Sequence, residues 1–307
     1  MKKLFLRLVG LVIILAVLDQ GVGLVLGIIR DHSPDGRYYK AKYTLETAEE
    51  DIVIIGSSRG ERDYVPYLME EAFGLSCWNA SRGGQGLPYF RAMQEGILNR
   101  YKPKLVILNL EVDILEHTPF YQQMGFMRAF YKKHQEIRPI LNKISPNEKW
   151  KLSSNIYAYN SSYYYLLRPY LFPGLDGKNS DKGWKPSVGI WEDPGYAFEV
   201  VNTAKPLHEA AVEELVSLVE GFIAKDIPLI FSIAPNYGER TEMTSSLHYI
   251  QDLAKKHDIP LFNFSSDTTF VTTAEYFIDI EHLNVEGAIL FTSKLIECMK
   301  DEIAGLD

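Results

Sequence analysis

Two short segments, far apart in the sequence, carry residue types that nucleophilic catalysis uses. Ser57 and Ser58 lie in IIGSSRGERD, where a glycine follows an apolar run. Asp279 and His282 are three residues apart in YFIDIEHLNVEG, ahead of an expected C-terminal helix. A carboxylate against one ring nitrogen of a histidine fixes the tautomer, and the other nitrogen can then deprotonate a serine hydroxyl. We therefore predict Ser58 as nucleophile, His282 as base and Asp279 as the group that orients the base.

Each segment also has a simpler interpretation. Small residues often follow the first strand of an α/β protein merely to form a turn, and Asp is a common cap where a helix begins. Glu281 could orient His282 in place of Asp279. A phosphate-binding loop is disfavoured because the G-x-x-x-x-G-K-[ST] pattern is missing from this segment.

Acyl transfer also needs N–H donors for the oxyanion, each worth about 3–4 kcal/mol in the transition state. The backbone N–H of Ser58 is one candidate. The glycine pair in NASRGGQG supplies a second, from Gly84 or, failing that, from Gly83, because glycine permits close backbone approach and a positive φ. An ordinary strand-to-helix turn would equally explain these glycines.

The hydrophobic pattern indicates the scaffold that must position these residues. Short apolar runs typical of buried parallel strands lie at 52–55, 76–79, 105–110, 228–233 and 261–264. Helical periods separate them, at 67–73, 88–100, 206–222, 243–254 and from 285 onward. This alternation predicts an α/β fold, a parallel sheet with helices on both faces, which places ligands at the carboxyl ends of its strands.

The N-terminus predicts a membrane anchor at 1–30. Three basic residues precede an apolar run at 8–29, whose 22 residues exceed the ~20 that cross a bilayer as a helix. Asp19 interrupts the run and must either become protonated or meet a partner. The basic residues favour a cytoplasmic N-terminus, with the rest of the chain in the periplasm or outside. A cleaved signal peptide and a buried helix are the alternatives. Polar residues 31–50 are expected to form a linker.

Residues 51–307 are expected to form one α/β domain with an aromatic-rich insertion at about 115–205, where the alternation stops. The insertion is either a cap over the strand ends or an excursion that packs on the core. The net charge of −8 argues against nucleic-acid binding. Cys77 and Cys298 lack partners at metal-ligand spacing and are expected to be small buried apolar groups, unless the fold pairs them. We expect neither a metal nor a cofactor.

Together, these segments resemble the SGNH, or GDSL-like, family of hydrolases and acyltransferases. Gly56–Ser58 is similar to its Gly-Asp-Ser block, with the second serine at the nucleophile position. Asn79–Gly84 resembles the block whose glycine supplies an oxyanion N–H, and Asp279–Asn284 resembles the final Asp-x-x-His-Leu-Asn block. The resemblance covers about 51–115 and 206–305. It implies a flavodoxin-like sheet and catalysis through an acyl-serine intermediate.

One block departs from the family pattern. The family's Gly-x-Asn-Asp block completes the oxyanion hole with its Asn side chain, whereas this chain has LNLEVD, with Asn109 at the usual Gly position and Glu111 near the Asn position. A carboxylate there would repel an oxyanion unless it is protonated or turned away. Arg59 and Arg82 flank the expected site, where they either bind an anionic substrate or pair with nearby acidic residues.

The anchor and the Gly-Ser-Ser turn look similar to membrane-anchored relatives that modify cell-surface polymers, such as the D-alanyl transfer protein of teichoic acid systems and alginate acetylation proteins. The resemblance implies a serine esterase or O-acyltransferase acting on cell-envelope glycans or related acyl esters. Its expected partners are the membrane, that substrate, and acyltransferase or polysaccharide-export proteins, without nucleic acid. The departure at Glu111 leaves a second hypothesis, an inactive glycan-binding or scaffold protein of an envelope polysaccharide machine.

Overall fold

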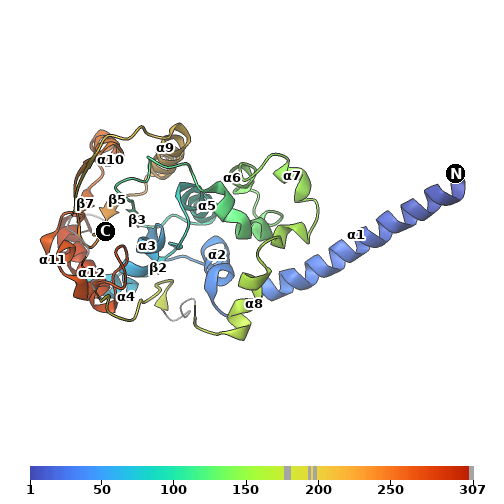
Figure 1. Ribbon diagram of the computed structural model, residues 1–307, viewed down its shortest axis with the longest axis horizontal. Coiled ribbons are helices and arrows are strands. Elements are labelled where there is room, and N and C mark those ends of the chain that lie inside the picture. The colour runs from blue at the N-terminus through green and yellow to red at the C-terminus, as the bar shows by residue number, and fades with distance from the viewer. Residues whose placement is uncertain (176–180, 193–194, 196–198, 304–307) are drawn as a thin grey trace.

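The central element is a five-stranded parallel sheet. The computed structural model describes residues 1–175, 181–192, 195 and 199–303 (Figure 1). The strands are β1 (Ile52–Ile55), β2 (Cys77–Asn79), β3 (Leu105–Asn109), β5 (Leu229–Ile233) and β7 (Leu261–Asn263). They lie in the order β2-β1-β3-β5-β7. The expected fold class is confirmed, and each strand begins and ends within one residue of its expected position.

Helices cover both faces of this sheet. One core lies between the sheet and α5 (Leu87–Leu98), α9 (Glu209–Ile223) and α10 (Ser245–Lys256). The other lies between the sheet and α4 (Pro66–Phe73) and α12 (Val285–Ile303). Val53 faces the first core and Ile54 the second, both fully buried, which is why the strands are apolar throughout. Cys77 lies in the second core, whereas Cys298, expected to be buried, is exposed; both are free thiols.

Helix α1 (Lys2–Asp31) extends away from the domain (Figure 1). It is long and apolar enough to cross a membrane, a test that a signal sequence also passes. The polar stretch after it is not the linker expected at 31–50, because Gly36–Glu46 form helix α2. Tyr38, Ala41 and Leu45 recur on one helical face and are buried in the first core, which explains why this polar sequence is helical.

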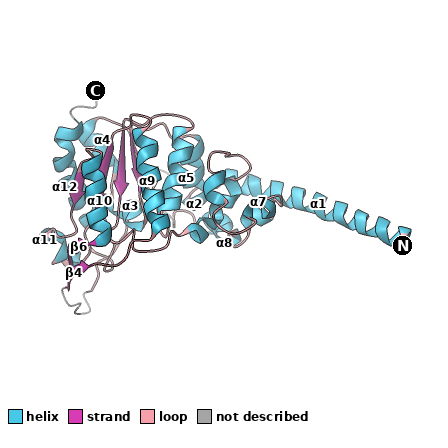
Figure 2. Ribbon diagram, turned by 90° about the horizontal axis from the view of Figure 1, so that it is seen from above, coloured by secondary structure: helices cyan, strands magenta, loops and turns pink. Residues whose placement is uncertain are grey.

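The expected insertion contains several short helices after β3. These are η1 (Tyr121–Phe130), α6 (Arg138–Leu141), α7 (Glu148–Lys151), η2 (Tyr157–Tyr159) and α8 (Tyr163–Leu171). Met124 and Phe130 join the first core, and α8 packs against α1 and α2. These helices extend the core sideways toward α1 (Figure 2). Further on, β4 (Glu199–Thr203) pairs in parallel with β6 (Glu239–Thr244) outside the main sheet.

Candidate active site

The sheet order reverses between β1 and β3, and in parallel sheets such a switch point opens a crevice at the carboxyl ends of the strands. Helix α3 (Ser58–Asp63) begins there, directly after β1. It lies unusually close to the end of β3, because a Cβ on Gly56 would come within 2.7 Å of Asn109 Cβ and one on Gly60 within 3.3 Å of Asn109 Oδ1. Glycine is therefore required at both positions, at position 56 by Asn109 and at position 60 mainly by Ser81, whose Oγ would lie 2.6 Å from a Cβ.

Ser58 is the first residue of α3 and is half-buried. Its backbone N–H donates to no acceptor among the described residues, so it is free to meet an anion. The neighbouring Ser57 behaves differently: its hydroxyl donates to Glu111 Oε1, across the switch point. The Glu111 carboxylate is thus directed at the Ser57 hydroxyl.

The glycine turn after β2 lies beside Ser58. A Cβ on Gly83 would be 3.5 Å from Ser58 Cβ. The Gly83 N–H is already used, since it donates to Glu61 Oε2 at 2.9 Å. Gly84 has φ +71° and, within the described part of the chain, its N–H makes no hydrogen bond. Of the two glycines, Gly84 is therefore the one with an N–H available to an oxyanion.

A buried carboxylate holds this turn against α3. Glu61 accepts hydrogen bonds from Lys40 Nζ at 3.1 Å and Arg82 Nη1 at 3.0 Å, and all three side chains are almost inaccessible to solvent. Burial opposes the charge on Glu61, but the Arg82 and Lys40 charges and the Gly83 N–H outweigh it and hold the pKa of Glu61 below its usual range. Of the two roles expected for Arg82, pairing with an acidic residue or binding an anionic substrate, the structure shows the first.

Asp279 and His282 are hydrogen-bonded to each other. His282 Nδ1 lies 2.9 Å from both carboxylate oxygens of Asp279, and Asp279 Oδ1 also accepts the N–H of Glu281 at 2.8 Å. Burial opposes ionisation, but these hydrogen bonds hold the pKa of Asp279 below its usual value. Because a carboxylate only accepts, the proton of the neutral ring lies on Nδ1 and Nε2 carries the lone pair. His282 Nε2 is buried without a hydrogen-bond partner among the described residues.

Asp63, at the far end of α3, holds the segment that carries His282. Its Oδ1 accepts the N–H of Leu283 at 3.1 Å, and its backbone carbonyl accepts the hydroxyl of Thr292 on α12. Burial raises the pKa of Asp63 well above its usual range, against the opposing charge of Arg59. Sequence reasoning missed Asp63 as a positioning residue, since its only signal is its place at the end of a six-residue helix.

Ser58 and His282 are linked through α3 rather than directly. The Ser58 hydroxyl makes no hydrogen bond in the described part of the chain, so the third contact of a triad is not formed in this structure. Five residue steps along α3, about 8 Å at 1.5 Å per residue, separate Ser58 from Asp63. Catalytic hydrogen bonds are often long before substrate binds, so the missing Ser58–His282 contact is compatible with a base–nucleophile pair that closes on the substrate.

The two remaining candidate residues are buried. Arg59 is 7% exposed and lies near Asp63. Asn109 is 1% exposed, and its amide donates to the Tyr64 hydroxyl at 3.1 Å, so it supports the packing of α3 on β3. No group of three or more metal-ligating side chains occurs among the described residues.

Comparison with known proteins finds similarity in structure only. No family profile and no curated protein matches the sequence. The chain is similar to a protein assigned to the G-D-S-L family of lipolytic proteins from Desulfitobacterium hafniense, with 11% identity and a TM-score of 0.42 over 80% of this chain and 97% of that one. It is also similar to a protein assigned as an acylhydrolase from Bacteroides fragilis, with 13% identity and a TM-score of 0.40 over 89% and 93%.

Removing the Asp63 side chain should loosen the His282 segment. Asp63→Ala leaves the buried Leu283 N–H without an acceptor, which costs about 1–3 kcal/mol. Asp63→Asn keeps a carbonyl oxygen in place and should be close to wild type. Urea unfolding and hydrogen exchange of a peptide spanning 278–285 would measure both effects. Equal damage from the two variants would show that the charge of Asp63, and not its acceptor oxygen, matters.

Neutralising Glu61 should be far more costly than neutralising an exposed glutamate. Glu61→Gln leaves the Lys40 and Arg82 charges buried without a counter-charge, a loss of about 3–5 kcal/mol. Glu95→Gln, which breaks a partly exposed pair with Arg91, should cost less than about 1 kcal/mol.

The Glu61 effect should also depend on pH. Because the folded pKa of Glu61 is depressed, its stabilisation is fully present above the unfolded pKa of about 4.3 and is lost as the pH falls below it. The difference in the free energy of unfolding between wild type and Glu61→Gln, measured with urea, should therefore become smaller in acid. A difference in the free energy of unfolding that stays constant from pH 7 to pH 3 would contradict an ionised Glu61.

Proposed function

We propose that the protein is a membrane-anchored serine esterase or O-acyltransferase that acts on cell-envelope glycans or related acyl esters through an acyl-Ser58 intermediate. The observation that carries the proposal is the Asp279–His282 pair, in which Nδ1 faces the carboxylate and Nε2 is buried without a partner among the described residues. A buried basic nitrogen without a partner is costly in a purely structural histidine. It is what a general base requires before substrate binds.

The reaction would proceed in two balanced steps. Ser58 Oγ attacks the acyl carbonyl while its proton passes to His282 Nε2, and Asp279 stabilises the imidazolium. The N–H groups of Ser58 and Gly84 would bind the oxyanion. His282 then protonates the leaving alkoxide, which departs as an alcohol and leaves acyl-Ser58. In the second step His282 removes a proton from water or a sugar hydroxyl, whose oxygen attacks the acyl carbonyl. The bond from that carbonyl to Ser58 Oγ then breaks, and His282 returns the proton to Ser58. Hydrolysis and transfer differ only in this acceptor.

The size of the acyl group is suggested by a small cavity beside Ser57 and Glu111, which Phe120 and Leu87 help to line. Its volume of about 40 Å³ leaves room for roughly three water molecules. A cavity of this size favours an acetyl group over a long acyl chain.

The membrane and envelope parts of the proposal rest on α1. In the orientation that its basic N-terminus favours, the catalytic domain faces the periplasm or the exterior, where glycan hydroxyls are available. Acyltransferase or polysaccharide-export proteins would be partners there, supplying acyl groups or polymer.

Glu111 favours a second candidate, a catalytically inactive glycan-binding or scaffold protein. It occupies the block in which the resembled family has an oxyanion-binding Asn, and its carboxylate bonds to Ser57 instead of offering an N–H. This candidate predicts no ester turnover, and glycan binding that survives His282→Ala.

Labelling with a serine-reactive fluorophosphonate tests the nucleophile. We expect Ser58 Oγ to displace fluoride and form a covalent adduct, and Ser58→Ala to abolish labelling. Ser57→Ala is the matched control, because it removes the adjacent hydroxyl and should leave labelling in place. His282→Ala should slow labelling by at least about a hundredfold, the usual contribution of a general base.

The same variants separate the two candidates. Equal labelling of Ser58→Ala and wild type would exclude Ser58 as nucleophile. Absence of labelling and of p-nitrophenyl acetate hydrolysis in wild type, with glycan binding retained in His282→Ala, would support the scaffold. Faster hydrolysis of a decanoate than of an acetate ester would contradict the expected short acyl group.

A further inference from the structure

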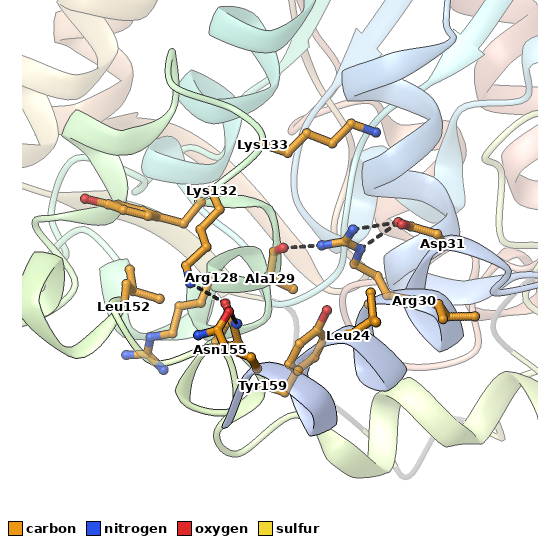
Figure 3. A pocket seen from close by; sticks show the side chains of 16 residues that line it. Leu24, Arg30, Asp31, Arg128, Ala129, Lys132, Lys133, Leu152, Asn155 and Tyr159 are labelled. Atoms are coloured by element: carbon orange, nitrogen blue, oxygen red, sulfur yellow. Dashed lines mark hydrogen bonds and ion pairs between the residues drawn. The ribbon is translucent and has the colours of Figure 1, made fainter. Parts of the chain in front are cut away.

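A large cavity lies against α1, and none of the proposed catalytic residues lines it. Its volume is about 500 Å³ (Figure 3). One wall is the C-terminal part of α1, including Leu24, Gly27 and Ile28. The opposite wall comes from residues 128–133 and 152–159. A cavity of this size can hold a sizeable part of a lipid or drug-like molecule.

Polar contacts lock this part of α1 onto the insertion. Asp19 accepts hydrogen bonds from the Ser154 hydroxyl and from the backbone N–H groups of Asn155, at 2.8 Å, and Ile156, at 3.1 Å. Four residues further along the helix, a Cβ on Gly23 would overlap Asn155. These hydrogen bonds from the insertion explain how a carboxylate at position 19 is tolerated within the apolar run. The second half of α1 is a fixed wall of the cavity.

The length of α1 places this junction at a membrane boundary. The exposed stretch Leu4–Leu18 is about 22 Å long at 1.5 Å per residue, whereas the hydrocarbon core is about 30 Å thick and needs ~20 residues. If α1 spans a bilayer, the hydrocarbon boundary must fall beyond Asp19. The docked segment at 154–156 and the mouth of the cavity then lie in the lipid interface.

The composition of the insertion suits that position. Residues 121–172 contain eight Lys or Arg and two Glu, in a chain whose net charge is −8. Helices α7 and α8 both belong to this insertion, and α8 packs beside the C-terminal part of α1 (Figures 1 and 2). These helices expose large side chains of the kind found at membrane interfaces: Trp150, Tyr163, Tyr164, Leu167, Tyr170 and Leu171. Amphipathic surface next to a spanning helix indicates contact with lipid.

The cavity carries one basic group that no carboxylate pairs among the described residues. Arg30 pairs with Asp31, Arg128 with Glu148 and Lys133 with Glu46, each within the cavity wall or next to it. Lys132 donates only to neutral oxygens, the Ser153 carbonyl and the Asn155 side chain. Figure 3 shows Lys132 extending to Asn155, beside α1. Its charge acts on the nearby Asp19 carboxylate of α1, but the two groups form no ion pair, so the ammonium can also bind an anion in the cavity.

We propose that this cavity binds one anionic phospholipid, with its head-group phosphate against Lys132 and its acyl chains along Leu24 and Ile28 of α1. The lipid would complete the junction between the anchor and the domain, filling the space between α1 and residues 152–159. The inference rests on α1 lying in a membrane, as proposed above, but not on the chemistry at Ser58.

Native mass spectrometry of the full-length protein in detergent, titrated with phosphatidylglycerol or phosphatidylcholine, tests the proposal. We expect one phosphatidylglycerol per chain, preferred over phosphatidylcholine. Lys132→Gln should weaken phosphatidylglycerol binding about fivefold, the usual effect of one basic residue on an anionic lipid. Ala158→Phe, which fills the cavity, should abolish it. Lys149→Gln is the matched control, because Lys149 lies on α7 outside the cavity and its loss should have no effect.

Several outcomes would overturn the proposal. Equal weakening by Lys132→Gln and Lys149→Gln would indicate diffuse charge attraction, and equal binding of the two lipids would indicate apolar contact alone. Binding that persists in a folded Ala158→Phe variant would place the lipid elsewhere on α1, and a second copy of the chain in place of lipid would identify a dimer interface. If Ala158→Phe does not fold, the phosphatidylglycerol affinities of Lys132→Gln and Lys149→Gln decide whether the lipid binds at Lys132. Fluorophosphonate labelling of Ser58 in the same samples reports the catalytic proposal separately, and extraction of the native protein from membranes at alkaline pH reports whether α1 is inserted.

Discussion

The buried charge of Glu61 is the constraint on which the candidate site depends. A carboxylate in the interior is tolerated only when it is paired and hydrogen-bonded, and Glu61 meets that requirement by drawing Lys40 from α2 and Arg82 and Gly83 from the turn after β2. Three segments distant in sequence are thereby held at the start of α3. Because the Gly83 N–H is used in this cluster, the N–H of Gly84 is the one left for the proposed oxyanion.

A second carboxylate, at the other end of the same short helix, fixes the opposite side of the site. Asp63 binds the segment after His282, while Asp279 orients the His282 ring. Since α3 is only six residues long, the proposed nucleophile Ser58 and the residue that supports the proposed base belong to one rigid unit. Any movement that closes Ser58 onto His282 must therefore come from side-chain rotation or from the 277–284 segment, and not from sliding of α3 along the sheet.

The sequence was sufficient to predict the parallel sheet, but not the buried polar contacts of Glu61 and Asp63. Strands such as β1 and β3 are buried on both faces, so each can be recognised in the sequence as a continuous apolar run. Helix α2 gave a weaker signal, because its buried face is interrupted by Lys40, whose burial depends on Glu61. Asp63 could not be recognised either, since its partner Leu283 is 220 positions away and the bond is to a backbone N–H that no residue type reveals.

The contact between Ser57 and Glu111 bears most directly on whether the site is catalytic. Glu111 follows β3 at the switch point, where the resembled family places an amide donor, and its negative charge would destabilise an oxyanion if it faced one. Its hydrogen bond to Ser57 directs the carboxylate at the residue before Ser58 instead. An oxyanion held by the Ser58 and Gly84 N–H groups would then have two donors, while the Glu111 carboxylate is hydrogen-bonded to Ser57. The replacement of Asp by Ser at position 57, relative to the family's Gly-Asp-Ser block, fits the same arrangement, because an aspartate there would repel Glu111 whereas a serine can donate to it.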